Sequence, residues 1–84
     1  MADVKATPEA IAQLAELPRV IRERIGNLFR RLERWPEVSG AKPLSGELVG
    51  WYRLRTGAYR LRFRVEGEAV IVDKIGHRSD FYGD

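Results

Sequence analysis

The sequence contains no cysteine and only one histidine, His77, among its 84 residues. The absence of cysteine excludes disulfide bonds, thiol nucleophiles and thiolate metal ligands. A single histidine is too few for the histidine-based sites that hold zinc. We therefore expect no metal and no cofactor, so any chemistry must come from side chains that act without them.

Long hydrophobic runs are also missing. The longest apolar run, Ala69 to Val72, is far too short to span a bilayer, and the N-terminus lacks the basic segment and apolar stretch of a secretory signal. Hydrophobic residues make up 44% and charged residues 32% of the chain, which is typical of a folded protein. We expect a cytoplasmic protein without a membrane partner, and the length fits a single domain, 1–84.

Lysine is scarce, and arginine takes its place. Only 3 of the 15 basic residues are lysine, and the formal net charge is +3. Arginine carries a planar guanidinium group that suits bidentate contacts with phosphate. This composition indicates an anionic partner.

Apolar residues at helical spacing predict two helices in the first half of the chain. Thr7 followed by Pro8 is typical of an N-cap and a first helical turn. The first helix is expected to end near Pro18, where a second begins and continues to Trp35 with one apolar and one basic face. The prolines and glycines of residues 36–50 predict a long connection.

After this connection the hydrophobic period becomes two, which predicts strands. Apolar residues and arginines alternate through 51–56 and 58–65, and an apolar strand follows at 69–76. Residues 4–6 are compatible with a short fourth strand. The predicted fold is α+β, with the N-terminal helical pair packed on one face of a mainly antiparallel sheet of three or four strands.

The other face of this sheet is expected to be open and basic. A turn at Thr56-Gly57 places Arg53 opposite Arg60, and a turn at Gly67-Glu68 places Arg62 opposite Asp73. The arginines expected on this face are Arg53, Arg55, Arg60, Arg62 and Arg64. With only Arg62 neutralised, a polyphosphate strand would offset the repulsion among the others. The alternative is a solvated face whose arginines pair with Glu47, Glu66 or Glu68.

The C-terminal segment supplies groups that can transfer protons. In the predicted register His77 lies opposite Ala58, so that His77, Arg78 and Tyr82 can approach the arginine face. Arginine stabilises developing charge but does not deprotonate in proteins. His77 and Tyr82 are therefore the candidates for acid–base work in a metal-free attack of an RNA 2′-hydroxyl on the adjacent phosphate. The alternative is that His77 bonds to the backbone and that Phe81 and Tyr82 form an apolar cap on the sheet.

Several segments carry a resemblance to a known family. They are Leu14-Ala15-Glu16-Leu17-Pro18-Arg19-Val20, Lys42-Pro43-Leu44-Ser45-Gly46, the stretch from Gly50-Trp51-Tyr52 to Tyr59-Arg60-Leu61, and Gly76-His77-Arg78-Ser79-Asp80-Phe81-Tyr82. Together they resemble the toxin superfamily that contains RelE and ParE, over nearly the whole chain. The resemblance implies a toxin of a bacterial type II toxin–antitoxin pair, with a cognate antitoxin protein as partner.

The RelE branch implies an activity. RelE-like toxins enter the ribosome and cleave messenger RNA without metal, leaving a 2′,3′-cyclic phosphate, and so inhibit translation. Arg60 and Arg78 match the arginines that stabilise the scissile phosphate, and Tyr82 matches the tyrosine that stacks on or orients the substrate nucleotide. Arg53 and Arg55 match a basic pair that is often lysine in the family, so His77 or Tyr82 would have to do more of the proton transfer here. The tail also departs from the family, since only three residues separate Arg78 from Tyr82.

Two other functions remain open at this point. The first is a ParE-like, non-catalytic inhibitor of DNA gyrase, because one fold serves both activities. The second is a degenerate member that keeps only antitoxin binding. In the nuclease interpretation, the basic side of the second helix is a candidate contact with ribosomal RNA, and it comprises Arg22, Arg30, Arg31 and Arg34.

Overall fold

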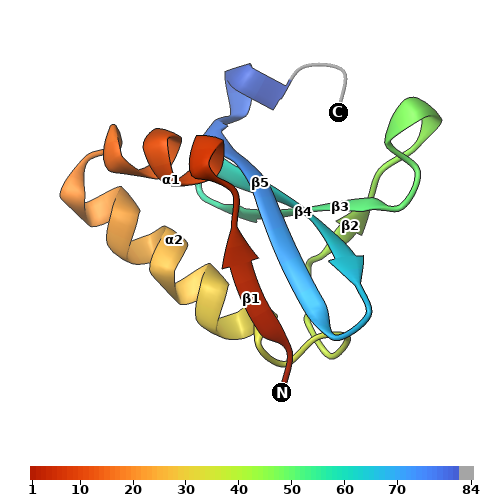
Figure 1. Cartoon of the computed structure of the whole chain (residues 1–84). Helices are drawn as coiled ribbons and strands as arrows, with labels where there is room; N and C mark the ends of the chain where they lie inside the picture. The colour runs from red at the N-terminus through yellow and green to blue at the C-terminus, as the bar shows by residue number, and fades with distance from the viewer. Residues whose placement is uncertain (82–84) are drawn as a thin grey trace.

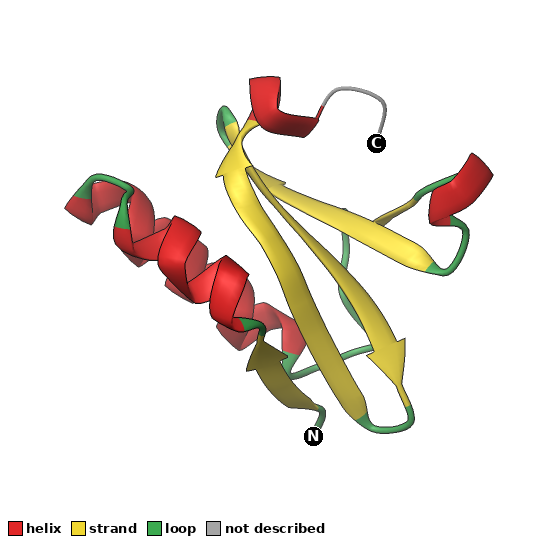
Figure 2. Ribbon diagram, turned by 45° about the horizontal axis from the view of Figure 1, so that its top comes forward, coloured by secondary structure: helices red, strands yellow, loops and turns green. Residues whose placement is uncertain are grey.

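The computed structural model describes residues 1–81. The elements follow in the order β1 (Asp3–Ala6), α1 (Pro8–Ala15), α2 (Arg19–Leu32), β2 (Lys42–Pro43), η1 (Gly46–Leu48), β3 (Trp51–Thr56), β4 (Tyr59–Glu66), β5 (Ala69–His77) and η2 (Arg78–Phe81). Both α-helices lie on the same side of the sheet (Figures 1 and 2). The predicted α+β class and helical pair are confirmed.

The sheet has five strands in the order β1-β5-β4-β3-β2. Strand β1 runs parallel to β5, and the other neighbours are antiparallel. The predicted number of three or four was too low because β2 has only 2 residues. A period-two pattern cannot be recognised over so short a segment.

The helices begin as the sequence predicts and end earlier. The Thr7 hydroxyl oxygen accepts a hydrogen bond from the Ala10 N–H at 3.1 Å, which confirms the N-cap. Helix α2 ends at Leu32 and not at Trp35. None of the helices in residues 1–81 is long and apolar enough to cross a membrane.

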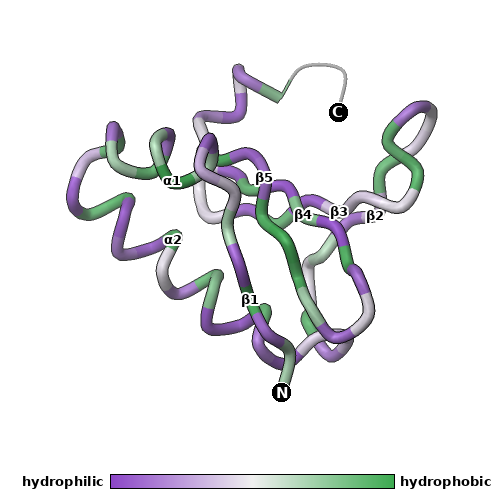
Figure 3. The backbone as a smooth tube through the Cα atoms, viewed as in Figure 1, coloured by the Kyte–Doolittle hydropathy of each residue, from purple (hydrophilic) through white to green (hydrophobic). Residues whose placement is uncertain are grey.

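The core lies between the helices and one face of the sheet. Its buried residues are Ala10, Ile25, Leu28, Leu32, Leu54, Leu61, Phe63, Val70, Val72 and Ile75. The Trp35 ring packs edge-on against Tyr52 and Phe63, with centroids 4.8 and 5.3 Å apart. In Figure 3, β5 is the most continuously hydrophobic strand, whereas α2 alternates between hydrophobic and hydrophilic positions. This alternation leaves the outer face of α2 polar.

The β3–β4 turn differs from the prediction. Gly57, at a φ of +61°, starts the turn, and Thr56 pairs with Tyr59. Arg55 therefore lies opposite Arg60, and the predicted pairing of Arg53 with Arg60 is wrong. The register moves by two positions, so every side chain keeps its predicted face.

The β4–β5 pairing contains a bulge, which changes the face on which the later side chains of β5 lie. Phe63 pairs with Val72 as predicted, but the register then shifts by one, so that Arg62 faces Lys74 and not Asp73. A shift of one residue exchanges the two faces of a strand for every later position. His77 consequently pairs with Tyr59 and not with Ala58.

Candidate functional site

Four arginines from three elements form what we call the basic cluster: Arg53, Arg55, Arg60 and Arg78. Burial, and then the neighbouring charges of the other three, lower the pKa of Arg60. The Nη1 atom of Arg60 is buried and has no hydrogen-bond partner within the part of the chain that the structure describes. An unsatisfied buried cationic donor is costly, so the cluster suits an anion that accepts this hydrogen bond.

A cavity of about 340 Å³ adjoins the basic cluster. Its lining includes Gly40, Lys42, Arg53 and Arg55. Lys42 comes from β2 and pairs directly with Arg53 of β3, so the outer strand brings a lysine to the site. Three cationic side chains around one hollow can contact neighbouring phosphates of a strand.

The first residues after β5 hold Arg78 in place. The Arg78 N–H donates a hydrogen bond of 2.7 Å to the Ala58 carbonyl oxygen. The Asp80 carboxylate accepts from the His77 N–H at 3.1 Å. A Cβ on Gly76 would lie 2.8 Å from Asp80 Oδ2, so glycine at this position leaves room for the Asp80 carboxylate beside the strand.

The structure does not bring the His77 ring into the basic cluster. The bulge turns this side chain to the face of Tyr59, whose ring it meets edge-on with centroids 5.4 Å apart. His77 Nδ1 accepts a hydrogen bond from the Ser79 N–H at 3.1 Å and lies 2.9 Å from Ser79 Oγ. Because Nδ1 is an acceptor, the proton of the neutral ring lies on Nε2.

The remaining two arginines of the predicted face are already paired. Arg62 donates to both carboxylate oxygens of Asp73, at 3.0 and 2.7 Å, which confirms the predicted partner despite the shifted register. Arg64 pairs with Glu66. The prediction that Arg62 alone is neutralised is therefore wrong, and the alternative of an ion pair with Glu66 holds for Arg64.

Sequence reasoning missed one residue on this face, Trp51. The guanidinium carbons of Arg62 and Arg64 each lie 5.1 Å from the centroid of its ring. The period-two alternation contained the signal, since Trp51 stands two residues before Arg53 and shares its face.

Tyr82 lies outside the described residues. Its neighbour Phe81 is buried, and Lys74 Nζ lies 4.6 Å from the centroid of the Phe81 ring.

The sequence also predicts that there is no metal site. Within residues 1–81, no group of three or more acidic or histidine side chains is arranged to hold a metal ion.

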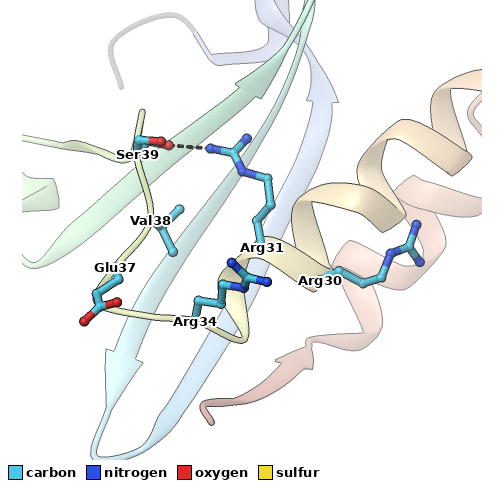
Figure 4. Close-up of a pocket in the computed structure, with 6 residues that line it drawn as sticks. All are labelled: Arg30, Arg31, Arg34, Glu37, Val38 and Ser39. Atoms are coloured by element: carbon cyan, nitrogen blue, oxygen red, sulfur yellow. Dashed lines mark hydrogen bonds between the residues drawn. The ribbon is translucent and has the colours of Figure 1, made fainter.

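A second basic hollow, of about 420 Å³, lies at the end of α2 (Figure 4). It is lined by Arg30, Arg31, Arg34, Glu37, Val38 and Ser39. Arg31 reaches across to donate to the Ser39 carbonyl oxygen, whereas Arg30 points away from residues 37–39 and bonds to Asn27. Arg22 donates to the Leu17 carbonyl oxygen at 2.6 Å. The predicted basic face of α2 thus exists, with some of its arginines held by local bonds.

The sequence of this chain matches a family model over residues 4–82. That family is described as the ParE toxin of the type II toxin–antitoxin system, parDE. The chain belongs to the RelE/ParE toxin superfamily. The resemblance of its motifs to this superfamily is thereby confirmed.

Individual relatives of this toxin support its membership of the superfamily. It is 37% identical to Toxin RelG of Mycobacterium tuberculosis over 82 residues, covering 94% of this chain and 93% of the relative. A crystal structure of the RelBE2 toxin–antitoxin complex from Mycobacterium tuberculosis has a chain with a TM-score of 0.81, 34% identity and coverage of 94% of this chain and 93% of its own. The isolated Escherichia coli RelE toxin, at 18% identity, shares the fold with a TM-score of 0.76 and coverage of 92% and 84%.

Proposed function

We propose that this toxin is a ribosome-dependent, metal-independent endoribonuclease that cleaves messenger RNA and so inhibits translation. The observation that carries the proposal is the buried Nη1 of Arg60, which has no hydrogen-bond partner among residues 1–81 and lies in a cluster that also contains Arg78. Donors held in place before the substrate arrives stabilise charge that develops in a transition state. The relatives named above support a RelE-type toxin.

In the proposed reaction, the 2′-oxygen of a ribose attacks the adjacent phosphorus while the bond to the 5′-oxygen of the next nucleotide breaks. The products are a 2′,3′-cyclic phosphate and a free 5′-hydroxyl group. Arg60 and Arg78 would donate hydrogen bonds to the phosphoryl oxygens, whose negative charge is stabilised in the transition state. Arg53 and Arg55, with Lys42 beside them, would bind the flanking phosphates.

One proton must leave the 2′-hydroxyl group and one must reach the leaving 5′-oxygen. Arginine remains protonated and serves neither step well. Tyr82 is the proposed group, as the sequence predicts. The His77 ring lies against Tyr59 and outside the basic cluster, so we assign it an orienting role, in which His77 positions residues 78–81 through its bonds with Ser79.

The test is to induce the toxin briefly in cells and to map new RNA 5′ ends at nucleotide resolution. We expect cuts within translated codons for the wild type, and their loss in Arg60→Ala and Arg78→Ala. Arg19→Ala is the matched control, because Arg19 is 84% exposed and pairs only loosely with Glu23 at 3.4 Å. Undiminished cleavage by both cluster variants would overturn the catalytic assignment.

A second candidate function is ParE-like inhibition of DNA gyrase without catalysis. The match to the ParE toxin family favours it. In that case the basic cluster would be a binding surface, and induction would stop DNA synthesis before protein synthesis. Pulse labelling of new protein and new DNA after induction distinguishes the two candidates. No growth defect at all would indicate a degenerate toxin that only binds its antitoxin.

We also propose a cognate antitoxin and the ribosome as partners. The RelBE2 relative is itself a toxin–antitoxin complex. An acidic antitoxin segment would neutralise the basic cluster, and the arginines at the end of α2 would contact ribosomal RNA phosphates. Co-expression of the antitoxin should abolish growth arrest, and Arg31→Ala with Arg34→Ala should weaken sedimentation of the toxin with ribosomes.

A further inference from the structure

Trp51 occupies the same face of the sheet as the basic cluster. It is the first residue of β3, and it pairs with Arg64 of β4. Side chains two residues apart on a strand are about 7 Å apart. Trp51, Arg53 and Arg55 therefore form a row along one strand, with the aromatic ring at the end and two members of the basic cluster next to it.

The indole ring is held by two arginines that are themselves held by carboxylates. Arg62 and Arg64 each place a guanidinium carbon 5.1 Å from the ring centroid. Asp73 fixes Arg62 with two hydrogen bonds, and Glu66 pairs with Arg64. The side chains of Arg62 and Asp73 are only 18% and 17% exposed, so this support is well ordered by packing. The ring is thus oriented before any ligand binds.

The charge of the open face is divided between two regions. In the basic cluster, the buried Nη1 of Arg60 has no hydrogen-bond partner among the described residues 1–81. Around Trp51, by contrast, the charges of Arg62 and Arg64 are offset by Asp73 and Glu66. Phosphates therefore favour the cluster, whereas an aromatic ring that is only partly buried offers a surface on which a base can stack.

We propose that Trp51 is a positioning residue that stacks on a nucleobase of single-stranded RNA, next to the phosphates bound by the basic cluster. This inference rests on the proposed ribonuclease function and adds a contact that orients the substrate strand. Stacking on an aromatic side chain is tolerant of base identity, because every base has a π-face. Trp51 would therefore determine the direction and register in which the RNA strand binds, and it would discriminate little between bases.

The test uses purified toxin and two ligands of similar charge. The first is a hexanucleotide of 2′-O-methyl RNA, which lacks the attacking hydroxyl group and is not cleaved. The second is inorganic polyphosphate, which carries charge but no bases. Binding is followed by intrinsic tryptophan fluorescence and, separately, by titration calorimetry, for the wild type, Trp51→Leu and Trp51→Phe.

We expect the RNA to quench the fluorescence of the wild type and the polyphosphate not to. In Trp51→Phe the remaining signal comes from Trp35, which packs against Tyr52 and Phe63, and it should not respond to either ligand. Trp51→Leu should bind RNA about tenfold more weakly, because stacking contributes about 1 to 3 kcal/mol per base. Its affinity for polyphosphate should be unchanged.

Equal quenching by both ligands, or an unchanged RNA affinity in Trp51→Leu, would overturn the role of Trp51 and leave the proposed function standing. If neither ligand binds the wild type, the inference is overturned, whereas the proposed function, which depends on the ribosome, is decided separately by the mapped RNA 5′ ends. The fluorescence of the wild type decides the question even if Trp51→Leu does not fold.

Discussion

The backbone N–H of Arg78 donates a hydrogen bond of 2.7 Å to the carbonyl oxygen of Ala58, in the turn between β3 and β4. This bond joins the start of η2 to the turn that precedes Arg60. The charge of Arg78 is consequently close enough to lower the pKa of Arg60. Two arginines that lie 18 residues apart in the chain can then contact one phosphate.

The close approach of η2 to the sheet predicts the effect of Gly76→Ala. The added methyl group would lie 2.8 Å from Asp80 Oδ2, so the Asp80 carboxylate must shift, which weakens its hydrogen bond from the His77 N–H and with it the placement of Arg78. We expect RNA cleavage to fall strongly, with a loss of about 1 to 3 kcal/mol in the free energy of unfolding. Urea denaturation and mapped 5′ ends measure the two effects.

Gly26→Ala is the matched control for this variant. A Cβ at Gly26 meets no atom within 4 Å, and the residue lies inside α2. The control should stabilise the fold by about 1 kcal/mol, since alanine is the better helix former. It should cleave RNA as the wild type does. Full activity in Gly76→Ala would refute the proposal that the position of Arg78 depends on the close packing of η2 against the end of β5.

The electrostatics of Arg60 predict a conflict between stability and activity. The pKa of Arg60 is lowered by burial and by three neighbouring arginines. A lowered pKa means that the folded state binds this proton more weakly than the unfolded state, so the charge destabilises the fold at every pH below that pKa. Arg60→Gln should therefore leave the free energy of unfolding unchanged or raise it by up to about 1 kcal/mol, while abolishing cleavage.

Thermal unfolding at about pH 6, 7 and 8 checks this prediction, because the benefit of Arg60→Gln should not vary in a range where arginine stays charged. Arg19→Gln serves as the exposed comparison and should change stability by less than about 0.5 kcal/mol. A marked destabilisation by Arg60→Gln would mean that the guanidinium group contributes packing that outweighs the repulsion.

Two substitutions of His77 separate an orienting role from proton transfer. The His77 ring accepts a hydrogen bond from the Ser79 N–H, two residues ahead, in the manner of an asparagine side chain in an Asx turn. If His77 orients η2, His77→Asn should retain most of the cleavage and His77→Ala should lose it. If His77 transfers a proton, both variants should be equally inactive. Single-turnover cleavage of ribosome-bound messenger RNA measures the difference.

The two ion pairs beside Trp51 should differ in their contribution to stability. The Asp73 side chain is 17% exposed and accepts two hydrogen bonds from Arg62, whereas the Glu66 side chain is 58% exposed. Asp73→Ala should cost about 1 to 3 kcal/mol, because it removes the half-buried carboxylate that accepts both of these hydrogen bonds from Arg62. Glu66→Ala should cost less than about 1 kcal/mol. Equal losses, measured by urea denaturation, would contradict this ranking.

Local patterns were enough to predict the class of fold and the composition of the open face. Thr7 and Pro8 mark the start of a helix through capping chemistry that involves only neighbouring residues. The alternation of arginine with apolar residues in β3 and β4 assigns each side chain to a face, because the strand period is two. That assignment is correct although the turn was predicted at the wrong residues, since a register change of two positions leaves every side chain on its predicted face.

The bulge in β5 was not predicted, although the spacing of the apolar residues in the sequence indicates it. Val70 and Val72 alternate, and the next buried residue is Ile75, not residue 74, so the hydrophobic phase slips by one. Which residue forms the bulge depends on packing against β4 and α1, where Gln13 accepts a hydrogen bond from the Ile75 N–H at 2.9 Å. A contact between residues 62 positions apart leaves no local signature.

The sequence thus dictated an arginine-rich sheet face on an α+β fold, because charge and period are properties of adjacent residues. Tertiary packing settled which of those charges face a ligand. It turned His77 toward Tyr59 and brought Arg78 beside Arg60, whereas the pair of Arg64 with Glu66 joins residues only two positions apart. The physical reason is that one extra residue in β5 exchanges the faces of all side chains after it. The hydrogen bond from the Arg78 N–H to the Ala58 carbonyl oxygen then holds the start of η2 against the β3–β4 turn.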